Sequence, residues 1–163
     1  MLNDNRIVVD VADMRVTNDI NAVIVTYALG SCIAVTIYDP VAKVGGMLHY
    51  MLPESSIDKQ KAEMRPFMFG DTGIPLLFKE AYKYGAIMDR IIVKLAGGAS
   101  IQDASGAFNI GKRNYLMARK MFWKNNVMID GESVGGMISR TLYLEMATGR
   151  IYFKSSGMGD VEI

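Results

Sequence analysis

Residues 20–38 form a run of nineteen residues without a charged side chain, and this run is the strongest constraint on the fold. Its length approaches that of a membrane-spanning helix. However, it is rich in valine, isoleucine and threonine, which favour strands, and Gly30-Ser31 interrupts it near its middle, where a turn is favoured. The run therefore predicts two buried strands, 23–29 and 33–38, joined by a tight turn, and no insertion into a membrane.

The composition agrees with one globular domain. The chain has 163 residues, of which half are apolar, and we expect a single domain over 1–163. The formal net charge is +1, so no excess of charge indicates a nucleic-acid or anionic-membrane partner. One cysteine excludes an intramolecular disulfide, and residues 1–6 lack the basic-then-apolar layout of a signal peptide. We therefore expect a cytoplasmic protein.

Outside the uncharged run, the pattern predicts more strands and two principal helices. A first strand is expected at 7–16. A turn opened by Asp39-Pro40 and closed by Gly45-Gly46 leads to the next strand at 47–52. The other expected elements are helices at 71–84 and 111–125 and strands at 90–96, 127–129, 139–146 and 150–153, the last two as a hairpin. This order predicts an α/β fold of the α+β type, with helices covering a sheet or paired sheets.

The turn that interrupts the uncharged run carries the only cysteine, Cys32. Thiol catalysis needs a reachable sulfur that a nearby cation or backbone dipoles keep charged. Gly30-Ser31 can supply access, because glycine lets the backbone bend sharply, and backbone amides of this turn could hold a developing oxyanion. A lone cysteine between apolar strands is, however, commonly a small core residue.

His49 is the only histidine, and it lies near the end of the strand that follows the Asp39-Pro40 turn. Adjacent antiparallel strands could bring it beside Cys32, where a neutral imidazole suits a general base. A lone histidine near a strand end is also commonly structural. From the residues alone, the pair is suggestive and leaves both interpretations open.

An ordered series of motifs resembles the chemoreceptor glutamine deamidase family, CheD. The motifs are Leu29-Gly30-Ser31-Cys32, Tyr38-Asp39-Pro40, the segment from Gly45-Gly46 to Pro53, Asp71-Thr72-Gly73-Ile74-Pro75, Gly97-Gly98-Ala99, Asn109 to Asn114, and Thr148-Gly149-Arg150. Together they cover nearly the whole chain, and the series is far more specific than any one of its parts.

The resemblance implies a layered α/β sandwich with a mainly antiparallel sheet core, and a Cys–His pair with a supporting Thr. The matching positions are Cys32, His49 and Thr26. It implies that the protein deamidates glutamine side chains of methyl-accepting chemotaxis receptors, without a cofactor. One cysteine and one histidine offer too few soft ligands for a metal site.

The resemblance also carries an alternative function and a further partner. Members of the family associate with a CheC-type phosphatase, so the chain could be a binding module that docks and regulates that partner without catalysis. The Cys32–His49 pair favours the enzyme, because docking needs no thiol. Arg113, on the second expected helix, could line the substrate groove or form an ordinary surface ion pair.

Residues 106–112 resemble a phosphate-binding loop. Arg113 stands where that loop requires Ser or Thr for magnesium, and the preceding segment, 97–105, is a loop instead of the required strand. Nucleotide binding is therefore not expected. A helix N-terminus with Asn109 as its cap explains the segment better.

Overall fold

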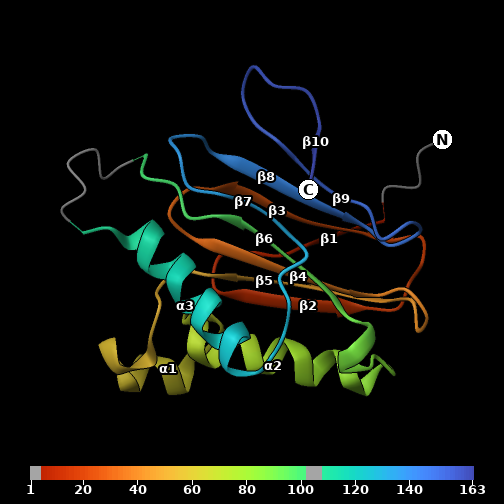
Figure 1. Cartoon of the computed structure of the whole chain (residues 1–163), viewed down its shortest axis with the longest axis horizontal. Coiled ribbons are helices and arrows are strands. Elements are labelled where there is room, and N and C mark those ends of the chain that lie inside the picture. The colour runs from red at the N-terminus through yellow and green to blue at the C-terminus, as the bar shows by residue number, and fades with distance from the viewer. Residues whose placement is uncertain (1–4, 102–107) are drawn as a thin grey trace.

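The chain folds into three layers, as a computed structural model describes it for residues 5–101 and 108–163 (Figure 1). One layer holds the helices, and the other two are β-sheets. The α-helices are α1 (Lys59–Met64), α2 (Gly70–Lys83) and α3 (Ile110–Lys124), and the short 3-10 turns are Ser55–Ile57, Pro66–Met68 and Met88–Arg90. Among the described residues, no helix is long and apolar enough to cross a membrane.

The sheet in the middle, here called the central sheet, has the strand order β2-β5-β4-β6-β7. Its strands are β2 (Asp13–Thr17), β5 (Val44–Tyr50), β4 (Ile33–Asp39), β6 (Ile92–Gly97) and β7 (Gly131–Val134). Every residue of β4 and β5 is buried. These strands have layers on both faces, which explains why the sequence shows an uncharged run there instead of an alternating pattern.

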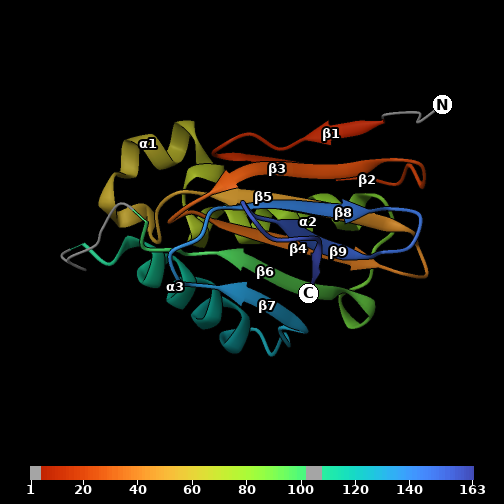
Figure 2. The same cartoon turned by 90° about the horizontal axis from the view of Figure 1, so that it is seen from above.

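The other sheet, here called the outer sheet, has the order β1-β3-β8-β9-β10 and lies over the central sheet (Figure 2). Its strands are β1 (Arg6–Val8), β3 (Val23–Leu29), β8 (Arg140–Glu145), β9 (Ile151–Lys154) and β10 (Val161–Glu162). In the described chain only β1–β3 and β6–β7 pair in parallel. The expected α+β fold, a mainly antiparallel sandwich with two principal helices, is therefore confirmed.

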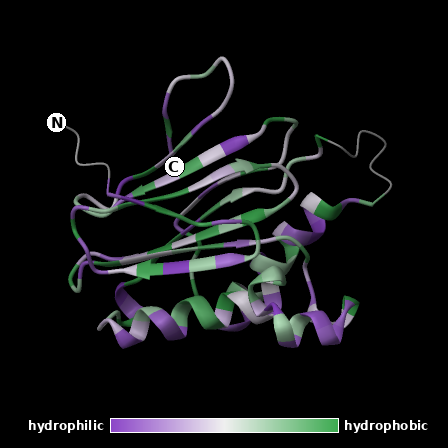
Figure 3. Ribbon diagram, turned by 180° about the vertical axis from the view of Figure 1, so that it is seen from behind, coloured by the Kyte–Doolittle hydropathy of each residue, from purple (hydrophilic) through white to green (hydrophobic). Residues whose placement is uncertain are grey.

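Two apolar cores hold the layers together. One core lies between the helices and the central sheet, where Leu77 and Phe122 pack with Leu48. The second lies between the two sheets and includes Ile24, Met47 and Leu142. Hydrophobic and hydrophilic residues alternate along the helices, as Figure 3 shows. The central sheet is thus fixed from both sides, and its strand ends can hold side chains in defined positions.

The expected single strand at 7–16 was wrong, because the chain changes sheets within it. The Val9 amide donates to Val25 O in the outer sheet, whereas the Ala12 amide donates to His49 O in the central sheet. Between them, Ala12 adopts a positive φ of 59° and the Asp10 amide donates to the Asp13 carboxylate. This turn sends β1 and β2 into different sheets.

Other boundaries also differ from the sequence prediction, and two of them have a clear cause. Gly45-Gly46 lies inside β5 instead of closing a turn. Glycine is needed there because a Cβ at Gly45 would lie 2.3 Å from Sδ of Met146, which directly follows β8 of the outer sheet. The strand expected at 127–129 begins only at Gly131. Asp130 precedes it, and its amide and carboxylate both bond to the backbone of Val93.

Candidate active site

Cys32 lies in the turn by which the chain crosses from the outer sheet to the central sheet. β3 and β4 are therefore not a hairpin, although the segment between them is as short as the sequence predicts. The Gly98 amide donates to Cys32 O at 2.9 Å, and the Ala99 amide donates to Gly30 O at 2.8 Å. A Cβ at Gly97 would lie 2.1 Å from Cys32 O, so only glycine permits this close approach.

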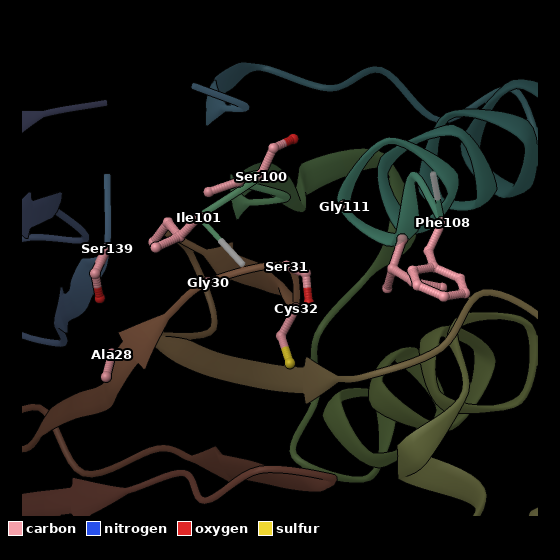
Figure 4. Close-up of a pocket in the computed structure, with 11 residues that line it drawn as sticks. Ala28, Gly30, Ser31, Cys32, Ser100, Ile101, Phe108, Gly111 and Ser139 are labelled. Carbon is pink, nitrogen blue, oxygen red and sulfur yellow. The ribbon is translucent and has the colours of Figure 1, made fainter. Parts of the chain in front are cut away.

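A cavity of about 610 Å³ opens over this turn (Figure 4). Phe108 and Gly111 stand on one side of the Cys32 thiol, and Ala28 and Ser139 stand on the other. The lining residues are Ala28, Gly30, Ser31, Cys32, Ala99, Ser100, Ile101, Phe108, Ile110, Gly111 and Ser139. The structure thus gives the predicted nucleophile, Gly30 and Ser31 access to one pocket.

His49 is buried in β5, with 2% of its surface exposed. Its Nδ1 lies 2.7 Å from Oγ1 of the fully buried Thr26. The Thr26 hydroxyl donates its hydrogen to Val9 O, also at 2.7 Å, so toward the ring it can only accept. This hydrogen-bond network assigns the proton of the neutral ring to Nδ1 and leaves Nε2 with a free lone pair. Within the described residues, Nε2 has no hydrogen-bond partner.

Cys32 and His49 face the same side of the central sheet. In the β4–β5 register Ala34 pairs with His49, and Cys32 precedes Ala34 by two residues, so that strand alternation directs all three side chains to the same face. His49 points toward the outer sheet, where Thr26 lies, and Cys32 packs against the core between the two sheets. The structure therefore brings the three predicted residues to one region, with no hydrogen bond between thiol and imidazole in the resting site.

Burial keeps the Cys32 thiol and the His49 imidazole neutral. It raises the pKa of the Cys32 thiol to about 11, although the Cys32 backbone amide opposes this shift. Burial also lowers the pKa of His49 to about 4, against the attraction of the Asp10 and Asp13 carboxylates. The sequence analysis expected a thiol kept charged. The structure instead holds a protonated thiol and a neutral imidazole, the protonation states that a thiol nucleophile and a general base would need.

Other predicted residues lie outside this arrangement. Arg113 is exposed on α3 and is not among the described residues that line the cavity. Asn109 stands at the N-cap position of α3 in the left-handed conformation, with φ of 49°, and its side chain does not make the expected capping bond. Residues 106 and 107 of the segment 106–112 lie outside the described residues. The described residues contain no cluster of ligands that could hold a metal.

Two residues that sequence reasoning gave no role hold the loops around the cavity. Asn114 of α3 donates its side-chain amide to Ser31 O and Met51 O. Arg140 is buried and donates to the carbonyls of Gly97 and Gly135. The Asn114 partners and the Gly97 partner of Arg140 are distant in sequence, so neither residue type nor local pattern could indicate them.

The comparisons with known proteins agree on one family. The model of a family described as CheD chemotactic sensory transduction matches residues 51–155. A protein of Syntrophus aciditrophicus named probable chemoreceptor glutamine deamidase CheD 1 is 59% identical over 93% of this chain and 94% of its own length. An alignment of that length necessarily includes residues 26–49.

More distant relatives carry the same name. Proteins named probable chemoreceptor glutamine deamidase CheD are 51% identical in Solibacter usitatus, over 93% of this chain and 90% of the relative, and 39% identical in Pyrococcus horikoshii, over 86% and 87%. Among solved structures, the crystal structure of Bacillus licheniformis hypothetical protein YfiH is similar at a TM-score of 0.43 and 12% identity, covering 77% of this chain and 51% of that one.

Proposed function

The chain belongs to the CheD family, and we propose that it is a chemoreceptor glutamine deamidase that uses Cys32 as nucleophile and His49 as general base. Its substrates are glutamine side chains of methyl-accepting chemotaxis receptors, which one domain over 1–163 converts to glutamate. The observation that carries the residue assignment is the free lone pair on His49 Nε2, which the hydrogen bond to Thr26 keeps available on the face of the central sheet that Cys32 also faces.

The reaction follows from these groups by ordinary acyl-transfer chemistry. Nε2 of His49 takes the thiol proton as Cys32 Sγ attacks the carboxamide carbon of the glutamine, which gives a tetrahedral oxyanion. The oxyanion collapses to a thioester, and His49 returns the proton to the departing ammonia. A water molecule then loses a proton to Nε2 and attacks the thioester, which releases glutamate and restores the Cys32 thiol.

Backbone amides of the Cys32 turn are suited to hold the oxyanion. Within the described residues, the Ser31 and Cys32 amides donate to no backbone carbonyl, whereas the nearby Gly98 and Ala99 amides are already used by the turn itself. Free amides directed at developing charge stabilise a transition state more than the ground state. We therefore assign the oxyanion to the Gly30-Ser31-Cys32 turn instead of to the Gly97-Gly98 loop.

The direct test is conversion of a receptor fragment. A purified cytoplasmic fragment of a chemoreceptor is incubated with the chain, and each glutamine is followed by mass spectrometry for amide-to-acid conversion. Conversion of particular glutamines at a rate that increases with enzyme concentration is expected. A fragment from a receptor of the same organism that stays fully amidated would contradict the proposed activity.

Thr26→Val is expected to lower kcat about 10-fold to 100-fold, because His49 loses the acceptor that fixes its tautomer and orientation. The matched control is Thr36→Val, since Thr36 is equally buried and donates to Lys94 O away from the cavity. Each change removes one buried hydroxyl, so melting temperatures of the two variants should fall similarly. Equal kcat values for both variants would show that Thr26 has no role in the reaction.

The alternative of a docking module without catalysis is not favoured, because the relatives are named deamidases and docking needs no thiol. A CheC-type phosphatase is instead proposed as a partner that covers the Cys32 cavity. Saturating partner is then expected to slow alkylation of Cys32 at least about 10-fold, in proportion to occupancy. Undiminished alkylation in a complex demonstrated by gel filtration would place the partner elsewhere.

A cytoplasmic location is part of the same proposal. The glutamines that a deamidase of this family modifies lie on the cytoplasmic helices of the receptor, so the enzyme must reach that compartment. A single, partly exposed free cysteine also suits a reducing compartment.

A further inference from the structure

Asn114 joins the two segments that carry the reacting groups. It lies fully buried in α3, and its side-chain nitrogen donates to Ser31 O at 2.9 Å and to Met51 O at 2.8 Å. Ser31 directly precedes Cys32, and Met51 follows His49 by two residues. One carboxamide group therefore uses both of its N–H hydrogens to connect the nucleophile turn with the end of the base strand.

This connection begins where the sheet ends. The β4–β5 ladder stops at the Ile33–Tyr50 pair. Beyond that pair the Met51 amide donates to Met68 O, away from β4. Within the described residues, the Asn114 side chain is the group that bridges the Ser31 and Met51 carbonyls across this open end. The Asn114 side chain therefore constrains the separation between the Cys32 turn and the His49 strand beyond the end of the ladder.

Helix α3 is itself held firmly against these segments. The Tyr50 hydroxyl donates to the main-chain O of Asn114 at 2.5 Å. Gly111 lies so close to the Gly98 loop that a Cβ there would stand 2.5 Å from Gly98 O. Because the backbone on both sides of the Asn114 amide is fixed, its two hydrogen bonds hold a defined geometry instead of following a mobile helix.

We propose that Asn114 is a positioning residue, which sets the distance between the Cys32 thiol and Nε2 of His49. The inference rests on the proposed Cys32–His49 chemistry, and it assigns Asn114 no contact with substrate. Since a displacement of about 1 Å at reacting atoms can cost about 100-fold in rate, loss of the bridge should reduce turnover more than substrate binding.

The test compares Asn114→Leu with Thr36→Val, a variant of β4 that loses a buried hydrogen bond away from the cavity. Asn114→Leu keeps the branched shape and the number of side-chain heavy atoms, and it removes both donors. It is expected to lower kcat about 10-fold to 100-fold with KM within about threefold, whereas Thr36→Val keeps kcat within about twofold. Thermal unfolding measures whether the two variants are similarly destabilised. Equal kcat values for Asn114→Leu and Thr36→Val at similar stability would overturn the proposal.

A second readout does not require deamidation. Iodoacetamide labels Cys32, the only thiol, and the labelling rate is measured from pH 5 to pH 10 in the parent, His49→Ala, Asn114→Leu and the double variant. If Asn114 positions the pair, Asn114→Leu loses the part of the rate that depends on His49, and its profile overlays that of His49→Ala. A difference in labelling rate between Asn114→Leu and the double variant would refute the inference. Equal labelling rates in the parent and His49→Ala would also refute it.

The two readouts separate failure of this inference from failure of the proposed function. A parent in which His49 tunes the thiol, but which converts no receptor glutamine, would refute the deamidase and leave the positioning role standing.

Should Asn114→Leu not fold, Asn114→Asp is measured at pH 5, where a buried carboxylic acid stays protonated and donates one of the two bonds. At pH 5 the labelling rate of Asn114→Asp is then expected to lie between those of the parent and His49→Ala. As the pH rises, the ratio of the Asn114→Asp rate to the His49→Ala rate should fall toward one. A rate equal to that of the parent at every pH would overturn the proposal.

Discussion

Cys32→Ala is expected to lower the conversion of receptor glutamine by about 10⁴-fold to 10⁶-fold, which is the loss seen when a covalent nucleophile is removed. The chain has no second cysteine that could replace it. The thiol is partly exposed in the cavity, so removal of its sulfur in Cys32→Ala leaves the apolar core almost unchanged. Mass spectrometry of a receptor fragment incubated with each protein measures the effect.

Thr36→Val serves as the control for handling and stability, and it should retain activity. Melting temperatures of Cys32→Ala and the parent should agree within a few degrees, so that lost conversion reports chemistry instead of unfolding. Cys32→Ser should also be nearly inactive, because a hydroxyl is a far poorer nucleophile than a thiol near neutral pH. Comparable conversion by Cys32→Ala and the parent would exclude the thiol mechanism.

The sequence predicted most of the central strands because their signal is local. The run 20–38 contains β3 with its bounds as predicted and β4 to within one residue. Helix α3 was also predicted to within about one residue, since its apolar spacing repeats over several turns. Composition and periodicity suffice where an element is long and its burial is uniform.

Elements that depend on distant contacts could not be predicted in this way. The three-residue strand β1 separates from β2 only because Val9 bonds to one sheet and Ala12 to the other. Gly45 resembles a turn residue, and only the approach of Met146 from the outer sheet shows why a strand needs glycine there. In both places tertiary contacts override the local preference.

The site residues remain a prediction from the family resemblance, whereas the electrostatics of the site could not be predicted from the sequence. Resemblance to a family indicated Thr26 and His49, but the tautomer depends on Val9 O, which accepts the Thr26 hydrogen from seventeen residues away. The neutral state of the thiol follows from burial, which no motif reports. Asn114 belongs to one of the resembling motifs, but nothing local indicates its hydrogen bonds, because its partners lie 83 and 63 residues away.

His49→Ala is expected to lower kcat/KM by about 10²-fold to 10⁴-fold at neutral pH, the usual contribution of a general base. In the parent, the neutral imidazole accepts the thiol proton. Its pKa is lowered to about 4, so activity should persist below pH 6.5 and fall only as the pH drops through about 4. Because the Cys32 thiol has a pKa raised to about 11, the parent rate should stay nearly flat between these limits.

The variant should respond to pH in a different way. Without a base, His49→Ala depends on the small fraction of Cys32 that is already thiolate, and this fraction increases about tenfold per pH unit until the pH approaches the thiol pKa. The deficit relative to the parent should therefore shrink steadily from pH 6 to pH 10. Measurement of kcat/KM over this range, with unfolding checked at each pH, tests the assignment. Parallel profiles would mean that His49 does not accept the thiol proton, because a structural role alone gives no reason for recovery in alkali.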